Sequence, residues 1–179
     1  MLRQSQHELL VPTRGRGFYP ITGEVEELVR KGEYQTGLAT LHLQHTSASL
    51  LIQENADPEV RRDLERFFSR LVPEGDRLFQ HTCEGDDDMP AHVRTALTAV
   101  NLGIPIAAGQ LALGTWQGLY LWEHRTHAHR RRVVVHLLGE YGGSSKSKAQ
   151  GKIQIQQSRR SETVLGQRAS STHPLRRLC

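Results

Sequence analysis

Apolar and polar residues alternate over several short runs in the first 140 residues. A period of two predicts strands that bury one face, because successive side chains point to opposite faces of a sheet. Gly109 and the polar run 126–130 separate the later runs, as turn residues do. The predicted strands occupy residues 6–13, 36–46, 47–53, 104–109, 110–124 and 131–140.

Other segments carry apolar residues at helical spacing. The segment 21–32 places Ile21, Val25 and Leu28 on one face and ends at Gly32, a typical helix stop. A second helix is predicted from Asp57-Pro58 to residue 71, because Asp suits an N-cap and Pro suits the first helical position.

A third helix is predicted to begin at Asp88-Met89-Pro90 and to end at Gly103, with Val93, Leu97 and Val100 as its apolar stripe. The strands and helices alternate without the regular spacing of parallel βαβ units. We therefore expect an α+β fold, a mainly antiparallel β-sheet sandwich with two or three helices.

Composition divides the chain into a domain, residues 1–140, and a tail, residues 141–179. The tail carries eight of the 23 Lys and Arg residues but only one of the 19 acidic residues. It is also rich in Ser and Gln and poor in apolar residues, so we expect it to be disordered. The basic charge of the chain belongs to this tail, and we expect no nucleic-acid role except through it.

The cellular location and membrane association of the protein are predicted from sequence features that the chain lacks. No apolar run approaches the roughly 18–20 residues that span a bilayer, and the N-terminal residues do not resemble a secretory signal. The two cysteines, Cys83 and Cys179, do not make a disulfide framework. We therefore expect no membrane contact and a cytoplasmic location.

Polar residues gather in the segment 45–58, HTSASLLIQENADP. Ser47 and Ser49 lack the glycines of a nucleophile elbow, so they are interpreted as strand residues that either bond locally or bind phosphate. Glu54 and Asn55 precede a helix N-terminus, which suits phosphate, and acidic neighbours suit a divalent cation bound with it.

Two further features have competing interpretations. The acidic run EGDDDMP, residues 84–90, is either a solvated loop that caps the third helix or a site for a hard cation such as Mg²⁺. The run GTWQGLYLWEHR, residues 114–125, is either an aromatic core strand or the lining of a pocket that contains Trp116.

Three of the ten histidines lie at the ends of predicted elements, beside polar residues. These are His45, His92 and His124. Three imidazoles from three elements can bind a Zn-type ion and leave a position open. Their sequence separations carry no local metal-binding signature, so spacing alone leaves the site undecided.

The chain resembles the YjbQ-like family, described as the secondary thiamine-phosphate synthase family, over nearly all of residues 1–140. The resemblance rests on LLVPTRGRGFYPIT, LQHTSASLLIQENADPEVRRDLERFF, EGDDDMPAHV, GQLALGTWQGLYLWEHR and RRVVVHLLGE. It implies a compact α+β homotrimer. It also implies an enzyme that joins a pyrimidine methyl diphosphate to a thiazole phosphate and releases pyrophosphate.

The same resemblance implies roles for individual residues. The implied metal ligands, for a divalent ion such as Zn or Mg, are His45, His92 and His124. The expected catalytic residues are Glu54, Glu123 and Arg125. The expected substrate-binding residues, for a small phosphorylated substrate, are Asn55, Asp87 and Asp88. To these the polar and aromatic runs add Ser47 and Trp116, independently of the resemblance.

Other function classes stay open at this point. One is a metal-dependent hydrolase of a small phosphorylated molecule, with Glu123 or Glu54 as base. Another is a non-catalytic trimeric module that binds small anionic ligands. A third gives the basic tail a role with nucleic acid or an acidic partner.

Overall fold

The computed structural model describes residues 1–142, which form eight strands and three helices. In chain order these are β1 (Leu2–Pro12), β2 (Gly17–Pro20), α1 (Thr22–Lys31), β3 (Tyr34–Leu43), β4 (Ala48–Glu54), α2 (Pro58–Leu71), α3 (Asp88–Leu97), β5 (Asn101–Ala107), β6 (Gln110–Leu111), β7 (Gln117–Glu123) and β8 (Arg130–Tyr141). The predicted α+β class is confirmed. The sequence predicts a disordered tail over residues 141–179. From residue 143 on, this tail lies outside the part of the chain that the structure describes.

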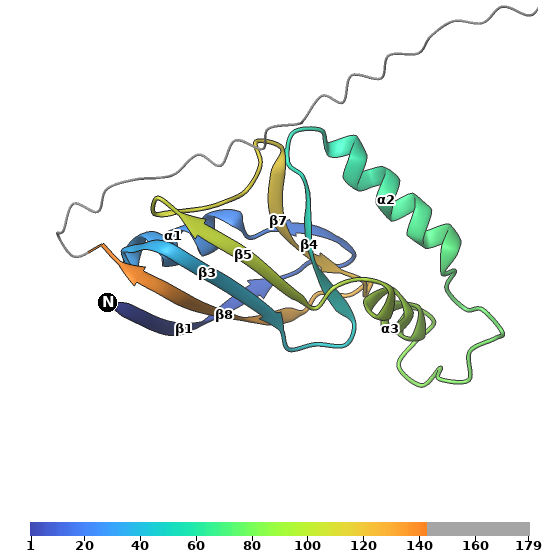
Figure 1. The fold of residues 1–179 in the computed structure, drawn as a ribbon. Helices are drawn as coiled ribbons and strands as arrows, with labels where there is room; N and C mark the ends of the chain where they lie inside the picture. The colour runs from blue at the N-terminus through green and yellow to red at the C-terminus, as the bar shows by residue number, and fades with distance from the viewer. Residues whose placement is uncertain (143–179) are drawn as a thin grey trace, which may run out of the picture. The chain divides into compact units, whose positions relative to one another are not determined.

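The strands form two antiparallel sheets, visible in Figure 1. The larger sheet has five strands in the order β1-β8-β3-β5-β6, and the smaller has the order β2-β7-β4. In the smaller sheet Ala48 pairs with Glu123 at one end, and Glu54 pairs with Gln117 at the other. This register decides which polar residues share an end of the sheet.

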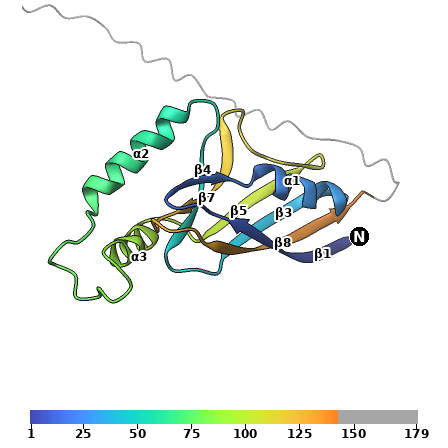
Figure 2. The same cartoon turned by 180° about the vertical axis from the view of Figure 1, so that it is seen from behind.

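The hydrophobic core is built from residues of both sheets and of α1, and Figure 2 shows these elements from the opposite side. Alternate positions of each strand contribute to it, as the period of two requires. Its fully buried members include Val133, Val135 and Leu137 of β8, Leu119 and Leu121 of β7, and Val25 and Val29 of α1.

The second face of β7 is covered as well. Trp122 is buried there, with its ring stacked 4.6 Å from Phe18 of β2 and edge-on, 4.8 Å away, to Phe68 of α2. Because both faces of β7 are buried, polar groups at its end must find partners inside the protein. Helix α3 lies near that end in Figure 1, and a long loop, residues 72–87, connects it to α2.

The helices begin and end close to where the sequence predicts, except for the end of the third. Asp57 caps α2 as predicted, since its Oδ1 accepts a hydrogen bond of 2.8 Å from the Glu59 N–H. The predicted end of the third helix at Gly103 is wrong. The helix ends at Leu97, because Thr98 is extended and its Oγ1 donates back to the Arg94 carbonyl over 2.7 Å. No helix within residues 1–142 is long and apolar enough to cross a membrane.

Candidate functional site

Two side chains that can bind a metal ion lie on one face of α3. Asp88 is the first residue of this helix, and His92 lies one turn later. Residues four apart on a helix are neighbours on its surface, so the two side chains meet. His81, from the preceding loop, reaches the same place, and its ring centroid lies 5.9 Å from that of His92.

The three side chains form a compact group. One ligand atom from each lies within 4.8 Å of the other two. The Oδ2 atom of Asp88 is 2.8 Å from His81 Nε2 and 3.3 Å from His92 Nε2. Three ligand atoms bound tetrahedrally to one zinc ion at about 2.0–2.1 Å lie about 3.4 Å apart, so this spacing suits a single ion.

The Asp88 carboxylate is held from behind by Arg125. Its Oδ1 atom pairs with the Arg125 guanidinium, while its Oδ2 atom faces the two imidazoles. The side chain of Asp88 is 3% exposed, whereas those of His81 and His92 are 46% and 34% exposed. The group therefore has a rigid buried carboxylate and two accessible nitrogen donors.

Asp87 fixes Arg125 rather than joining this group. Its Oδ2 accepts from the Arg125 Nε at 3.2 Å and from the Thr126 N–H and hydroxyl at 2.8 and 2.9 Å. Burial raises the pKa of Asp87, but these hydrogen bonds outweigh it and lower the pKa to about 2. Asp87 is therefore a charged structural anchor at neutral pH.

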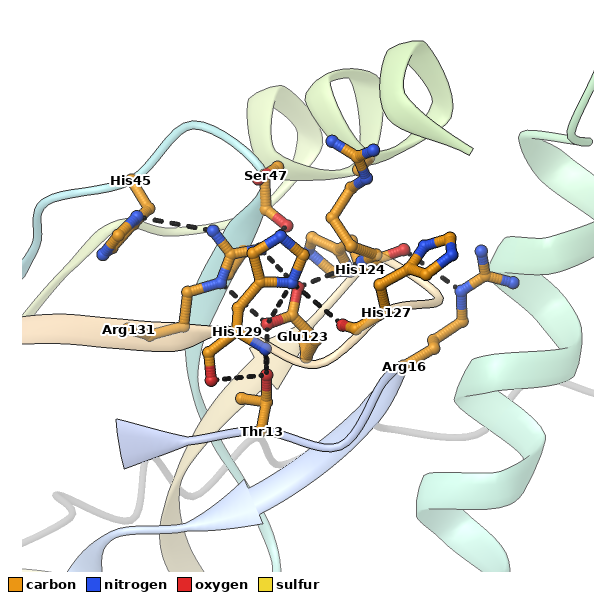
Figure 3. A network of polar contacts seen from close by, with 12 residues as sticks. Thr13, Arg16, His45, Ser47, Glu123, His124, His127, His129 and Arg131 are labelled. Carbon is orange, nitrogen blue, oxygen red and sulfur yellow. Dashed lines mark hydrogen bonds and ion pairs between the residues drawn. The ribbon is translucent and has the colours of Figure 1, made fainter. Parts of the chain in front are cut away.

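A second carboxylate, Glu123, lies at the end of β7 and is completely buried (Figure 3). Its Oε2 accepts from Thr13 at 2.8 Å and from the Arg131 Nε at 2.7 Å. Its Oε1 accepts from Arg131 Nη2 and the Arg125 N–H. Burial raises the pKa of Glu123, and the hydrogen bonds outweigh it and lower the pKa. No acceptor position stays free for a substrate proton.

His124 follows directly on this strand and is also completely buried. Its Nε2 lies 2.7 Å from the Ser49 hydroxyl, and its Nδ1 has no partner within residues 1–142. Burial, and then the charges of Arg94 and Arg16, lower the pKa of His124 to about 3. The Ser49–His124 pair is therefore neutral and closed to substrate.

His45 lies in the connection between β3 and β4, half-buried beside Arg131 (Figure 3). Its Nε2 accepts a 2.9 Å hydrogen bond from the Arg132 N–H. Burial, and then the Arg131 charge, lower the pKa of His45. His45 and His92 both line a groove of about 500 Å³ whose walls also include His42, Thr46, Thr95 and Val100.

Comparison with known proteins assigns the chain to a family. The family model described as "UPF0047 protein YjbQ-like" matches residues 7–140. The chain belongs to the YjbQ-like UPF0047 family. A UPF0047 protein of Synechocystis is 51% identical over 138 residues, which is 77% of this chain and 94% of that protein. The UPF0047 protein YjbQ of Escherichia coli O157:H7 is 43% identical over 136 residues, 75% of this chain and 98% of that protein.

Two solved structures share the fold. A YbjQ-like protein of unknown function from Sulfolobus solfataricus superposes with a TM-score of 0.72 at 22% identity, covering 78% of this chain and all of that one. A conserved hypothetical protein from Thermus thermophilus gives a TM-score of 0.64 at 36% identity, covering 72% of this chain and 97% of that one.

These relatives correct the predicted activity. The expectation of a secondary thiamine-phosphate synthase is withdrawn, because the matching relatives are named only as UPF0047 proteins. Structural neighbours in the YjbQ-like family are described as of unknown function or as uncharacterized. Membership of the family is thus confirmed, while the activity attached to it is not carried over.

The structure also changes the predicted set of metal ligands. Within residues 1–142, the trio His45, His92 and His124 does not bring its ligand atoms within 4.8 Å of one another. The lone pair on Nε2 of His45 is engaged by the Arg132 N–H, and His124 lies in the interior. Only His92 of the three belongs to the His81–Asp88–His92 group.

His81 was missed, although the sequence holds a signal for its partners. An aspartate four residues before a histidine, on a segment that begins a helix, places both side chains on one face. Nothing local points to His81 itself, since its approach depends on how the loop 72–87 folds back on α3.

The remaining predicted site residues lie at two ends of the smaller sheet. Glu54, Asn55 and Trp116 lie at the β4–α2 end, where the Asn55 amide donates to the Gln117 carbonyl and Trp116 is 64% exposed. Ala48 of β4 pairs with Glu123 of β7, and Glu54 lies six residues further along β4. At about 3.3 Å per residue this is about 20 Å. Within one chain, these residues therefore do not share a site with Glu123 and Arg125.

Ser47 lies at the Glu123 end but is 9% exposed. Its backbone carbonyl accepts a 3.4 Å hydrogen bond from Arg131 Nη2. The chain around Ser47 thus helps to hold Arg131, and substrate binding by its hydroxyl stays a prediction.

Proposed function

We propose that this protein binds one divalent transition-metal ion at His81, Asp88 and His92. The observation that supports the proposal is the convergence of two imidazole nitrogens on one oxygen of a buried carboxylate, over 2.8 and 3.3 Å. Three protein ligands leave a coordination position open, which water or a small ligand can occupy. The proposed function is therefore binding at an open metal centre, in which the ion serves as a Lewis acid.

The ligand chemistry favours one class of ion. Mg²⁺ prefers oxygen ligands and keeps several waters, whereas imidazole nitrogen suits Zn²⁺, Fe²⁺ and related ions. Two of the three ligands here are imidazoles. Of the two predicted ions, Zn²⁺ is therefore the one we propose, and Mg²⁺ is expected to bind much more weakly.

The surroundings of Asp88 support the same role. Outer partners that hold a ligating carboxylate orient it and tune the metal site. Arg125 holds the far oxygen of Asp88 and is itself held by Asp87. This chain of contacts fixes the oxygen that faces the imidazoles before any ion arrives.

Zinc titration of the metal-stripped protein tests the proposal. We expect one zinc ion per chain, and binding weaker by about 100-fold or more in His92→Ala and in His81→Ala, because each removes a direct ligand. His42→Ala is the matched control, since His42 lines the neighbouring groove but bonds to Asn101. Equal zinc affinity in wild type and both ligand variants would end the proposal.

Self-association is a separate proposal. The predicted homotrimer has a candidate contact surface on the face of the larger sheet that points away from the core. Leu38 pairs with Leu138 there, and Leu10 lies on the same face; all three are 37–43% exposed. Light scattering of wild type and Leu38→Asp tests it: a trimer that dissociates in the variant supports it, and a wild-type monomer refutes it.

A further inference from the structure

The protonation state of His45 can be read from its neighbours. The Arg132 N–H is a backbone donor, and it lies 2.9 Å from His45 Nε2. Nε2 must therefore carry a lone pair. In a neutral imidazole the other nitrogen then carries the proton, so His45 presents Nδ1–H as a donor.

A second donor points at that same nitrogen. The Nη1 atom of Arg131 lies 3.4 Å from His45 Nδ1, and a guanidinium has no acceptor atoms. The pair is therefore two donors face to face, with no acceptor between them within residues 1–142. The Arg131 side chain is 4% exposed, so its Nη1 has little access to water to compensate.

An unpaired buried donor is costly, and it is satisfied when a ligand supplies an acceptor. The buried Arg131 donor and the half-buried His45 donor beside it match an oxyanion, since one oxygen can accept from both. His45 lines the groove of about 500 Å³, which gives a ligand its approach.

The charges around His45 select the class of anion. Among the Arg and Glu side chains whose charges act on His45, Arg131 and Arg132 contribute two positive charges and Glu123 contributes one negative charge. The balance of one positive charge suits a monoanion better than a dianion. The groove also has apolar walls, from Leu43, Ala96 and Val100, which suit a short hydrocarbon chain.

From this geometry we propose that His45 Nδ1–H and Arg131 Nη1–H form a binding site for the carboxylate of a small monocarboxylic acid. The rest of the ligand lies in the groove that His45 shares with His92. This site goes beyond the proposed metal centre and does not depend on it, because neither donor belongs to the His81–Asp88–His92 group.

Titration of metal-stripped protein with butyrate, followed by NMR, tests the proposal. We expect saturable shifts at His45 and along the groove, and binding at least about 10-fold weaker, or about 1.4 kcal/mol, in His45→Phe. Arg131→Lys is the second variant, because a lysine still carries the charge that pairs with Glu123 but lacks the forked donors. It should weaken butyrate binding by a similar factor. His136→Ala is the control and should bind butyrate as wild type does, because His136 lies beside Gln4, outside the lining of the groove.

Several outcomes would overturn the proposal. Tighter binding of inorganic phosphate than of butyrate would replace the monocarboxylate with a different anion. Unchanged butyrate affinity in His45→Phe, or no saturation in wild type, would remove the site. The imidazole ¹⁵N spectrum of His45 gives an independent check, since a proton found on Nε2 instead of Nδ1 contradicts the argument at its first step. Zinc binding plays no part in these readouts, so failure here leaves the metal centre standing.

Discussion

Two buried carboxylates, Glu123 and Asp88, lie near the same end of the smaller sheet and have opposite surroundings. Both oxygens of Glu123 are filled by Thr13, Arg131 and the Arg125 N–H, and the residue is completely buried. Asp88 gives one oxygen to Arg125 and turns the other toward two half-exposed imidazoles.

The comparison distinguishes a carboxylate that only stabilises the fold from one that can still bind a ligand. A buried carboxylate with all its acceptor positions filled stabilises the fold and has nothing left to offer a ligand. A buried carboxylate with one oxygen beside two imidazoles can exchange those contacts for a metal ion. Glu123 and Arg131 thus join the two sheets, whereas Asp88 is the side chain on which ligand binding depends.

The largest expected effect is on stability, from Glu123→Gln. The substitution keeps the shape of the side chain but leaves Arg131 buried without its counter-charge, which typically costs about 3–5 kcal/mol. Urea denaturation of the metal-free protein measures it. Zinc affinity, measured below the transition, should stay within a few-fold of wild type. A stability loss below about 1 kcal/mol would show that Glu123 is not the structural charge of the pair.

Asp88→Asn should show the opposite pattern. The amide no longer offers a charged oxygen to the ion, so zinc affinity should fall by about 100-fold or more, about 2.7 kcal/mol. Calorimetric titration at neutral pH measures the change. If Asp88→Asn binds zinc as wild type does while Glu123→Gln does not, the roles assigned to the two carboxylates are reversed.

The buried, neutral imidazole of His124 should also affect how the free energy of unfolding depends on pH. Its pKa of about 3 in the folded protein lies below the ordinary value of 6.5, so the unfolded chain takes up a proton that the folded one does not. Stability from this group is present above pH 6.5 and is lost as pH falls toward 3. Between about pH 7 and pH 5 wild type should lose about 2 kcal/mol more than His124→Gln. Parallel stability curves for the two proteins would contradict the neutral buried imidazole.

The smallest expected effect distinguishes two aspartates at helix starts. Asp57 caps α2 by accepting from the Glu59 N–H, and it belongs to neither carboxylate network. Asp57→Ala should lower the free energy of unfolding by about 1 kcal/mol, as loss of an N-cap does. Zinc affinity should not change, and a clear loss of zinc binding would mean that the metal centre depends on more of the chain than Asp88 and its neighbours.

The fold was largely predictable because its strands and helix starts have local causes. The apolar runs located the long strands, and Asp57-Pro58 located the start of α2. The single strand predicted over residues 110–124 is wrong, because β6 and β7 are separate strands in different sheets. The short strand β2 was missed, since four residues that include Gly17 and Pro20 carry little periodicity. The end of α3 was misplaced because the spacing of Val100 continues the helical pattern although the chain has already turned at Thr98.

The candidate site was less predictable because it depends on long-range placement. Glu54 and Glu123 look equivalent along the sequence, and only the register of β4 with β7 separates them by six residue pairs. Asp88 and His92 carry a local signal, the spacing of four on a helix. His81 has none, because a loop with no regular structure brings it to them.

Diffraction from zinc-soaked crystals, with data collected at the zinc absorption edge, tests the central claim most directly. The account predicts one strong anomalous peak per chain, bonded to Nε2 of His81, Oδ2 of Asp88 and Nε2 of His92 at about 2.0–2.2 Å. A peak bound instead by His45 or His124, or no peak within bonding distance of Asp88, would contradict it.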